Sequence, residues 1–203
     1  YEEKIALRKR AITAAYFNTF DGNFVMNVQG ANVFAVDLGL GNEKTYENVV
    51  DYYTKLGCFD TGIFATDILV RVLFEHGNAE LAADLLMNNG AQGYEHWRRI
   101  GATTFHEYWD SGRSRSHNHP MFGAPVAYFF EYLLGIKQDT ESAGYQYVTI
   151  APTAVSKFGY MKGSMRVPKG DIAVAYEKVE DKVRFDISIP EGVSAKFKYM
   201  EQE

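Results

Sequence analysis

The sequence predicts an α+β protein in which helical hairpins come first and an antiparallel β module follows. Apolar residues recur every three or four positions through residues 2–134, which is the spacing of amphipathic helices. After Gly135 they alternate every second position, which is the spacing of strands. Because helices and strands occupy separate parts of the chain, we expect two domains. The polar stretch 137–144 places them at residues 1–138 and 139–203.

The composition narrows the possible functions. A chain of 203 residues is long enough to bury a sizeable core. Its net charge of -5, without a basic block, argues against a nucleic-acid partner. No apolar run reaches membrane-spanning length, so no membrane partner is expected. The single cysteine excludes an intramolecular disulfide, and the content of 14 Tyr and 14 Phe suits either a carbohydrate site or a large core.

The helical part is predicted to consist of paired helices joined by short turns. The expected helices span residues 2–18, 31–40, 42–56, 61–76 and a stretch from Asn78 past Leu86. Gly57 and Gly77 are expected to close the third and fourth helices. Asp60 is expected to support the start of the fourth helix, and Asn78 to cap the fifth. Such pairs are typical of stacked hairpins, as in a solenoid or an α/α barrel.

The end of the helical part and the β module follow from the same patterns. Residues 121–134 are apolar nearly all round, which predicts a buried helix with Pro125 in its first turn. Strands are expected around residues 148–150, 172–176, 183–189 and 197–199, with a turn at Glu180-Asp181. These short alternating segments predict an antiparallel sandwich or part of one.

One stretch, residues 101–110, carries the candidate chemistry. Glu107 lies between His106 and the aromatic pair Tyr108-Trp109. A carboxylate among aromatic rings fits a sugar-handling site, because glycoside hydrolysis uses carboxyl groups and aromatic faces stack on sugars. It also fits a structural acid that caps a turn or pairs with Arg113 or Arg115, because buried acids often have purely structural roles. The residues by themselves leave both interpretations open.

The polar loop that follows holds His117 and His119. Two histidines without a third ligand make a weak metal signal, so an ordinary loop histidine or a hydrogen-bond donor to a sugar hydroxyl is favoured. The sequence contains no phosphate-binding glycine loop, no Cys/His framework and no Gly-x-Ser-x-Gly elbow. We therefore predict no metal and no cofactor.

Several motifs occur in an order that is familiar from one enzyme family. They are Thr61-Gly62-Ile63-Phe64, Leu81-Ala82-Ala83-Asp84-Leu85-Leu86, Gly101-Ala102-Thr103-Thr104 with Glu107-Tyr108-Trp109-Asp110, Ser116-His117-Asn118-His119-Pro120-Met121-Phe122-Gly123-Ala124, and Ile150-Ala151-Pro152. They closely resemble the bacterial α-L-rhamnosidases of glycoside hydrolase family seventy-eight, and this resemblance covers most of residues 30–198. The most specific part is the block from Gly101 to Ala124.

The resemblance implies the later hairpins of an (α/α)6 barrel followed by a C-terminal antiparallel β-sandwich. It also implies an inverting hydrolase that releases terminal rhamnose. Glu107 matches the family's general base, His119 matches a histidine that contacts the sugar, and Trp109 matches an aromatic with a structural or sugar-facing role. His106 and Tyr94 complete the expected sugar-binding set.

The chain departs from the family pattern in three ways. His106 stands where the family usually has Trp, and Tyr108 stands where Arg is common. The Asp-Glu-Arg-x-Gly-Trp type of motif that carries the family's general acid does not occur in the 203 residues. We therefore expect the C-terminal portion of a longer or truncated enzyme, which supplies the base, lacks the acid and is inactive by itself.

The expected partners are a rhamnose-containing oligosaccharide or glycoside and the remainder of the parent chain. The sequence does not determine the cellular compartment. Three alternatives stay open. A non-catalytic carbohydrate-binding module could hold a sugar with Trp109, Tyr94 and His119. Another α/α-barrel glycosidase could use the same base on a different sugar, and a helical scaffold would bind no sugar.

Overall fold

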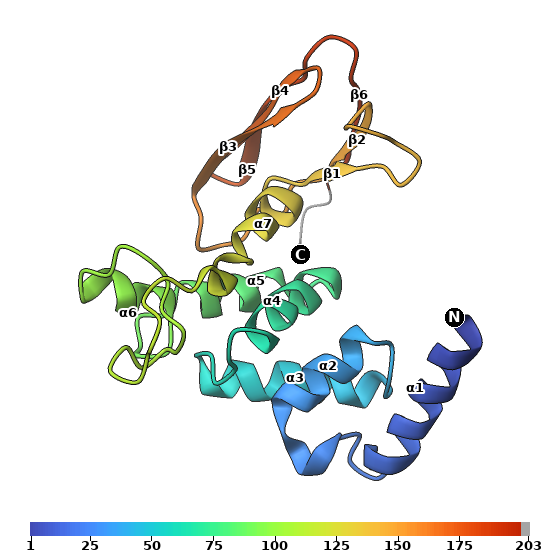
Figure 1. Cartoon of the computed structure of the whole chain (residues 1–203). Coiled ribbons are helices and arrows are strands. Elements are labelled where there is room, and N and C mark those ends of the chain that lie inside the picture. Colours follow the sequence, from blue (N-terminus) through green and yellow to red (C-terminus); the bar gives the residue numbers. More distant parts are fainter. Residues whose placement is uncertain (200–203) are drawn as a thin grey trace. The chain divides into compact units, whose positions relative to one another are not determined.

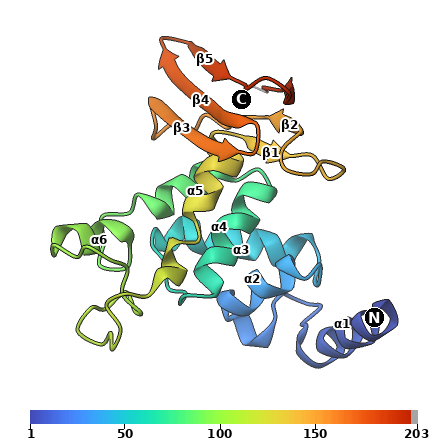
Figure 2. The same ribbon diagram turned by 45° about the horizontal axis from the view of Figure 1, so that its top comes forward.

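The structure is a computed structural model that describes residues 1–199, except for the Asn27 side chain. The chain divides into two compact units, Tyr1–Gly123 and Ala124–Glu203. Figures 1 and 2 show helices in the first unit and mostly strands in the second. Helical hairpins followed by antiparallel-rich sheets confirm the predicted fold class. No helix within residues 1–199 is long and apolar enough to cross a membrane.

The first unit is built from helices joined by short turns. They are α1 (Glu2–Tyr16), η1 (Val25–Asn27), α2 (Gln29–Asp37), α3 (Glu43–Leu56), α4 (Ala65–Glu75), α5 (Ala79–Leu86), α6 (Tyr94–Arg99) and η2 (Pro120–Gly123). Helix α2 packs against α3 and α4, and α5 packs against both α3 and α4 (Figures 1 and 2). This confirms the predicted pairing of helices.

The packing of the hairpins follows the apolar stripes of the sequence. Val49 and Tyr53 on α3 and Leu69 and Leu73 on α4 have no exposed surface. Helix α1 is different, because it forms as predicted but buries none of its residues. Its helical conformation is therefore not maintained by a packed apolar face.

The helix ends show which capping predictions were right. Gly57 (φ 67°) closes α3 and Gly77 (φ 81°) follows α4, as expected. Asp60 does not cap α4, which begins only at Ala65; its carboxylate accepts hydrogen bonds from Tyr52 and Tyr53. Asn78 occupies the N-cap position of α5, but its side chain makes no cap bond.

The predicted single helix over residues 121–134 is wrong. The structure has η2 to Gly123, a short α7 (Val126–Tyr128) and a π-helical turn η3 (Phe129–Leu133). Pro125 explains the break, because proline has no N–H and disfavours helical backbone in the residue before it. Val126 is exposed, so the segment is also not buried all round.

Within residues 124–199 the second unit contains two three-stranded sheets. One has the order β1 (Ile136–Gln138), β2 (Tyr147–Ile150), β6 (Ser194–Phe197), and the other has the order β3 (Tyr160–Val167), β4 (Gly170–Val179), β5 (Lys182–Ser188). All pairs are antiparallel except β2 with β6, which is parallel. The expectation of antiparallel pairing does not hold for β2 and β6. Strands β3 to β5 lie between these two strands in the sequence, and a long connection of this kind allows parallel pairing. The expected domain boundary, between residues 138 and 139, lies at the end of β1.

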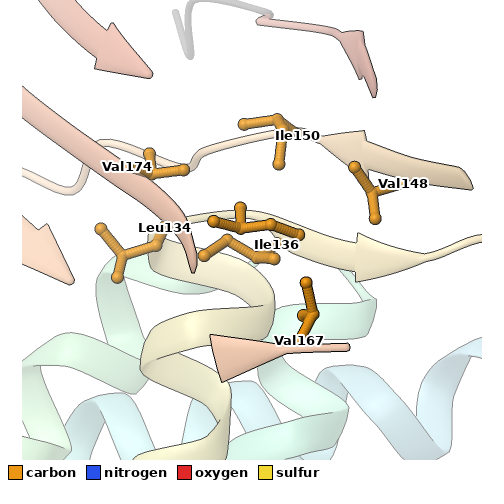
Figure 3. Packing of buried hydrophobic residues seen from close by; sticks show 7 residues of the cluster. Leu134, Ile136, Val148, Ile150, Val167 and Val174 are labelled. Atoms are coloured by element: carbon orange, nitrogen blue, oxygen red, sulfur yellow. The ribbon is translucent and has the colours of Figure 1, made fainter. Parts of the chain in front are cut away.

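A cluster of aliphatic side chains joins the two sheets of this unit. Its buried members are Leu134, Ile136, Val148, Ile150, Val167, Ile172 and Val174, six of which Figure 3 labels. Leu134 follows η3, and the others come from β1 and β2 on one side and from β3 and β4 on the other. The two sheets therefore share one apolar core, as in a small β-sandwich.

Candidate functional site

The loop that follows α6 folds back on itself and positions Glu107. The backbone N–H of His119 donates to the Phe105 carbonyl at 2.7 Å, and the N–H of Glu107 donates to the Ser116 carbonyl at 3.0 Å. These bonds set residues 105–107 beside residues 116–119 in an irregular hairpin. The Asn-His segment thus lies next to the candidate carboxylate, although twelve positions separate His119 from Glu107.

The Glu107 side chain is half-buried and lines a hollow of about 540 Å³ with Tyr108, Arg113 and Arg115. Its Oε2 accepts the backbone N–H of Ser116 at 3.3 Å. No ion pair between Glu107 and either arginine forms within residues 1–199. The carboxylate is therefore held by backbone and reachable from the hollow, so it can accept a proton from a bound water.

Trp109 belongs to the same loop, and its side chain lies inside a buried aromatic cluster. Only 7% of its surface is exposed, and its indole N–H donates to the Thr61 carbonyl at 2.8 Å. Its ring stacks against Phe59 and Trp97, with centroid distances of 5.4 and 4.8 Å. This packing favours the structural one of its two expected roles, and direct contact of Trp109 with a sugar stays a prediction.

Tyr94 is a member of the same aromatic cluster. Its hydroxyl donates to the Phe122 carbonyl at 2.8 Å, and its ring meets Trp97 and Trp109 edge to face. Burial, with a smaller contribution from the charge of Asp67, raises the pKa of Tyr94 above its usual value. Its sugar contact is likewise still a prediction, because the hydroxyl proton is already engaged within the chain.

Trp97 is a site residue that the sequence did not reveal. It is 3% exposed, and its indole N–H has no acceptor among residues 1–199. It contacts Phe105 and His106 as well as Trp109. The helix that carries Trp97 has six residues, too few to show a periodic apolar stripe.

His106 and His117 stack on one another, with ring centroids 4.0 Å apart and an interplanar angle of 12°. His106 is buried, and its Nδ1 lies 2.9 Å from the Ser111 hydroxyl. Burial lowers the pKa of His106, and the nearby His117 and His96 lower it further. The neutral imidazole is therefore favoured, and His106 braces the loop rather than facing open solvent.

The two loop histidines do not point to a metal. His117 stacks on His106, whereas the His119 imidazole forms no hydrogen bond within residues 1–199. Over the same residues, no group of three or more His, Cys, Asp or Glu side chains is placed to hold a metal ion. The His119 ring is therefore free to donate to a ligand, and its contact with a sugar stays a prediction.

The helical unit and the β unit match two consecutive domains of one class of glycosidase. Residues 1–133 match the family model of the bacterial α-L-rhamnosidase six-hairpin glycosidase domain, and residues 135–201 match that of the bacterial α-L-rhamnosidase C-terminal domain. The chain therefore belongs to the bacterial α-L-rhamnosidase family. This confirms the resemblance inferred from the motifs.

Individual relatives agree with this assignment. An α-L-rhamnosidase of Formosa agariphila is 33% identical over 82% of this chain, and one of Alteromonas sp. (strain LOR) is 31% identical over 68%. The chain spans 19% and 16% of the length of these two curated relatives. It therefore corresponds to less than a fifth of either protein.

Solved structures show the same fold. The α-L-rhamnosidase from Dictyoglumus thermophilum superposes with a TM-score of 0.80 at 24% identity, covering 93% of this chain and 22% of that one. The Streptomyces avermitilis α-L-rhamnosidase, solved with L-rhamnose, superposes with a TM-score of 0.82 at 22% identity, covering 93% of this chain and 19% of that one. At these identities the likeness concerns the fold.

Proposed function

We propose that this chain forms the C-terminal part of an inverting α-L-rhamnosidase and supplies its general base, Glu107. The observation that supports this most is the state of the carboxylate. Glu107 lies in the loop that carries the family motif, is held by the Ser116 backbone, and lines a hollow without forming an ion pair within residues 1–199. A general base needs that combination of fixed position and free lone pairs.

In the proposed reaction Glu107 removes a proton from water while the water oxygen attacks the anomeric carbon of rhamnose. The glycosidic bond breaks, and a general acid on the other side protonates the departing oxygen. Inverting enzymes hold the two carboxyl groups about 6.5–9.5 Å apart to admit the water. The motif that carries the family's general acid does not occur in the 203 residues. In this proposal the acid is therefore supplied by another part of the parent protein.

The other candidate residues are assigned by what they contact. His119 donates to a sugar hydroxyl in this proposal, because its imidazole is free of hydrogen bonds within residues 1–199. Trp109, Tyr94 and His106 hold the loop in place, because their rings and polar atoms contact other residues of the cluster. The substrate is a rhamnose-containing glycoside or oligosaccharide.

Incubation of the purified chain with an aryl rhamnoside tests whether the chain supplies the general base but lacks the general acid. We expect no hydrolysis above the uncatalysed rate, because general acid catalysis by a carboxyl group is missing. Robust turnover by the chain that disappears in Glu107→Gln would show that both carboxyl groups lie within it, and would overturn this part of the proposal.

A sugar-binding role without hydrolysis is the second candidate, favoured by the presence of a single carboxylate at the hollow. Thermal unfolding with and without rhamnose addresses it, because a ligand that binds the folded state stabilises it by mass action. Stabilisation by rhamnose fits both proposals, and hydrolysis by the complete enzyme separates them. A helical scaffold predicts no stabilisation at all.

A further inference from the structure

The sheet of β3, β4 and β5 carries a hollow on the face that points away from the apolar core. Figure 2 shows these three strands side by side, with β4 in the middle. Val174 on β4 belongs to the core, and successive residues of a strand point to opposite faces, so Ala175 points outward. The hollow over this outer face, called the sheet hollow below, measures about 420 Å³. That volume lies in the range of about 300–1,000 Å³ that is typical of small-ligand sites.

The register of the strands sets the width of the sheet hollow. Lys162 on β3 is opposite Ala175, and Ala175 is opposite Asp186 on β5. Cross-strand partners share one face, so these three side chains, which all line the sheet hollow, form a row across the sheet. The strands that carry Lys162 and Asp186 lie two strand spacings apart, about 9.5 Å. Because the methyl group of Ala175 is short, it leaves a space between the two longer side chains.

A second row of side chains forms one end of the sheet hollow. Tyr160 is opposite Glu177, which in turn is opposite Arg184. Arg184 Nη2 donates to Glu177 Oε2 at 2.5 Å, so these two charges are paired with one another. The Tyr160 side chain is 59% exposed, so much of its aromatic surface is open to a ligand.

The charges of the sheet hollow are balanced but only partly paired. Lys162 and Asp186 are exposed, and their side chains form no hydrogen bond or ion pair within residues 1–199. One side of the sheet hollow thus offers free N–H donors, and the other side offers free carboxylate oxygens. Together with the Glu177–Arg184 pair, the lining residues carry two positive and two negative charges. Such a site suits an uncharged ligand that both donates and accepts hydrogen bonds.

We propose that the sheet hollow binds one uncharged pyranose sugar. Lys162 donates to hydroxyl oxygens at one edge of the sugar, Asp186 accepts from hydroxyl groups at the other edge, and Tyr160 packs against the apolar face of the ring. A phosphate or carboxylate is attracted by Lys162 but repelled by Asp186, and a cation meets the reverse, so neither is preferred. The inference goes beyond the proposed function, because none of these residues belongs to the loop that carries Glu107.

A nuclear magnetic resonance titration of the isotope-labelled chain tests this inference. The probes are the methyl glycosides of L-rhamnose, D-glucose and D-galactose. We expect at least one of them to shift the backbone amide signals of residues 160–162, 175–177 and 184–186, because these segments line the sheet hollow. Shifts caused by the rhamnoside support rhamnose as the ligand, and shifts caused by either other glycoside support a different pyranose of the same glycan.

Two variants test the named contacts. Tyr160→Ala and Asp186→Asn are each expected to raise the dissociation constant of the bound glycoside about tenfold, because they remove the stacking face and the charged acceptor. Tyr147→Ala is the matched control and should leave the dissociation constant unchanged. Tyr147 is a 55% exposed tyrosine on β2, and it does not line the sheet hollow.

Three results would overturn the inference. The first is that none of the probes shifts the amide signals of the sheet hollow, and the second is an unchanged dissociation constant in either variant. The third is the absence of a Tyr160→Ala effect in an isothermal titration of the complete enzyme, because another part of the parent protein would then cover the sheet hollow. The proposed function is tested separately, by the effect of Glu107→Gln on hydrolysis of an aryl rhamnoside.

Discussion

At the scale of single residues, His106 links the stability of the loop to pH. Because its pKa is lowered in the folded state, the unfolded state binds the proton more readily. The stabilisation is therefore complete above the unfolded-state pKa of about 6.5 and is lost as the pH falls through the lower folded-state value.

His106→Phe is expected to flatten the fall in the thermal midpoint between about pH 7 and pH 5, because it removes the proton linkage. The measurement is thermal unfolding followed by circular dichroism across that range. His76→Phe is the control, since His76 is an exposed histidine that stacks on Tyr46 in another part of the unit. An unchanged slope in His106→Phe would contradict this explanation.

Trp109 gives a second prediction at this scale. Trp109→Ala removes a buried ring from the aromatic cluster and leaves the Thr61 carbonyl without its indole donor. The free energy of unfolding in urea should fall by about 3–5 kcal/mol. Tyr108→Ala, at the exposed neighbouring ring, should change it by less than about 0.5 kcal/mol. Similar losses in both variants would show that Trp109 is not a packing residue.

At the scale of elements, the turn from η3 into β1 depends on a glycine. Gly135 has a φ of 70°, and a Cβ there would lie 2.1 Å from the carbonyl carbon of Ala151. Gly135→Ala should therefore destabilise the β unit by about 4 kcal/mol or more, since the clash is with backbone. Gly192 has a φ of 84°, and a Cβ there would have its nearest contact at 3.6 Å. Gly192→Ala therefore isolates the cost of the backbone conformation, about 1 kcal/mol.

These two variants are compared by denaturant unfolding of the purified chain. The midpoint is followed by far-ultraviolet circular dichroism, and each variant is compared with the unchanged chain under the same conditions. Equal destabilisation by Gly135→Ala and Gly192→Ala would mean that the close approach to Ala151 is not what makes Gly135 necessary.

The elements that the sequence predicted are those with a strong repeated signal. Helices α3 to α5 have apolar stripes bounded by glycine or asparagine, and β4 and β5 alternate apolar with polar residues. Strand β3 was missed because Gly163 and two methionines replace branched apolar residues on its inner face. The break at Pro125 was missed because the apolar run on either side of it looked continuous.

The candidate site was predicted in part for a similar reason. Glu107 and His119 belong to a short motif, so sequence could find them. Phe59 and Thr61 support Trp109 from 50 and 48 positions earlier in the chain, Trp97 supports it from 12 positions earlier, and no local pattern marks these contacts. The separation of Arg115 from Glu107 depends on how the loop closes, which only the structure shows.

At the scale of the whole molecule, the chain matches two family domains but is much shorter than its curated relatives. Both family models match, yet the chain spans less than a fifth of the curated relatives reported above. Within residues 1–199 the Trp97 indole N–H has no acceptor and Glu107 is the carboxylate that lines the hollow, as expected of a site completed by other parts of a longer protein. The division of base and acid between two parts follows from this proposal.

The most direct test of the account is the hydrolysis of an aryl rhamnoside by the complete enzyme that carries this chain. Glu107→Gln should lower kcat by about 10²–10⁴-fold, which is the usual contribution of a general base, and leave the unfolding midpoint nearly unchanged. Glu47→Gln makes the same chemical change in an exposed ion pair on α3 and should keep wild-type kcat. A Glu107→Gln enzyme that keeps wild-type kcat would contradict the assignment of Glu107 as the base.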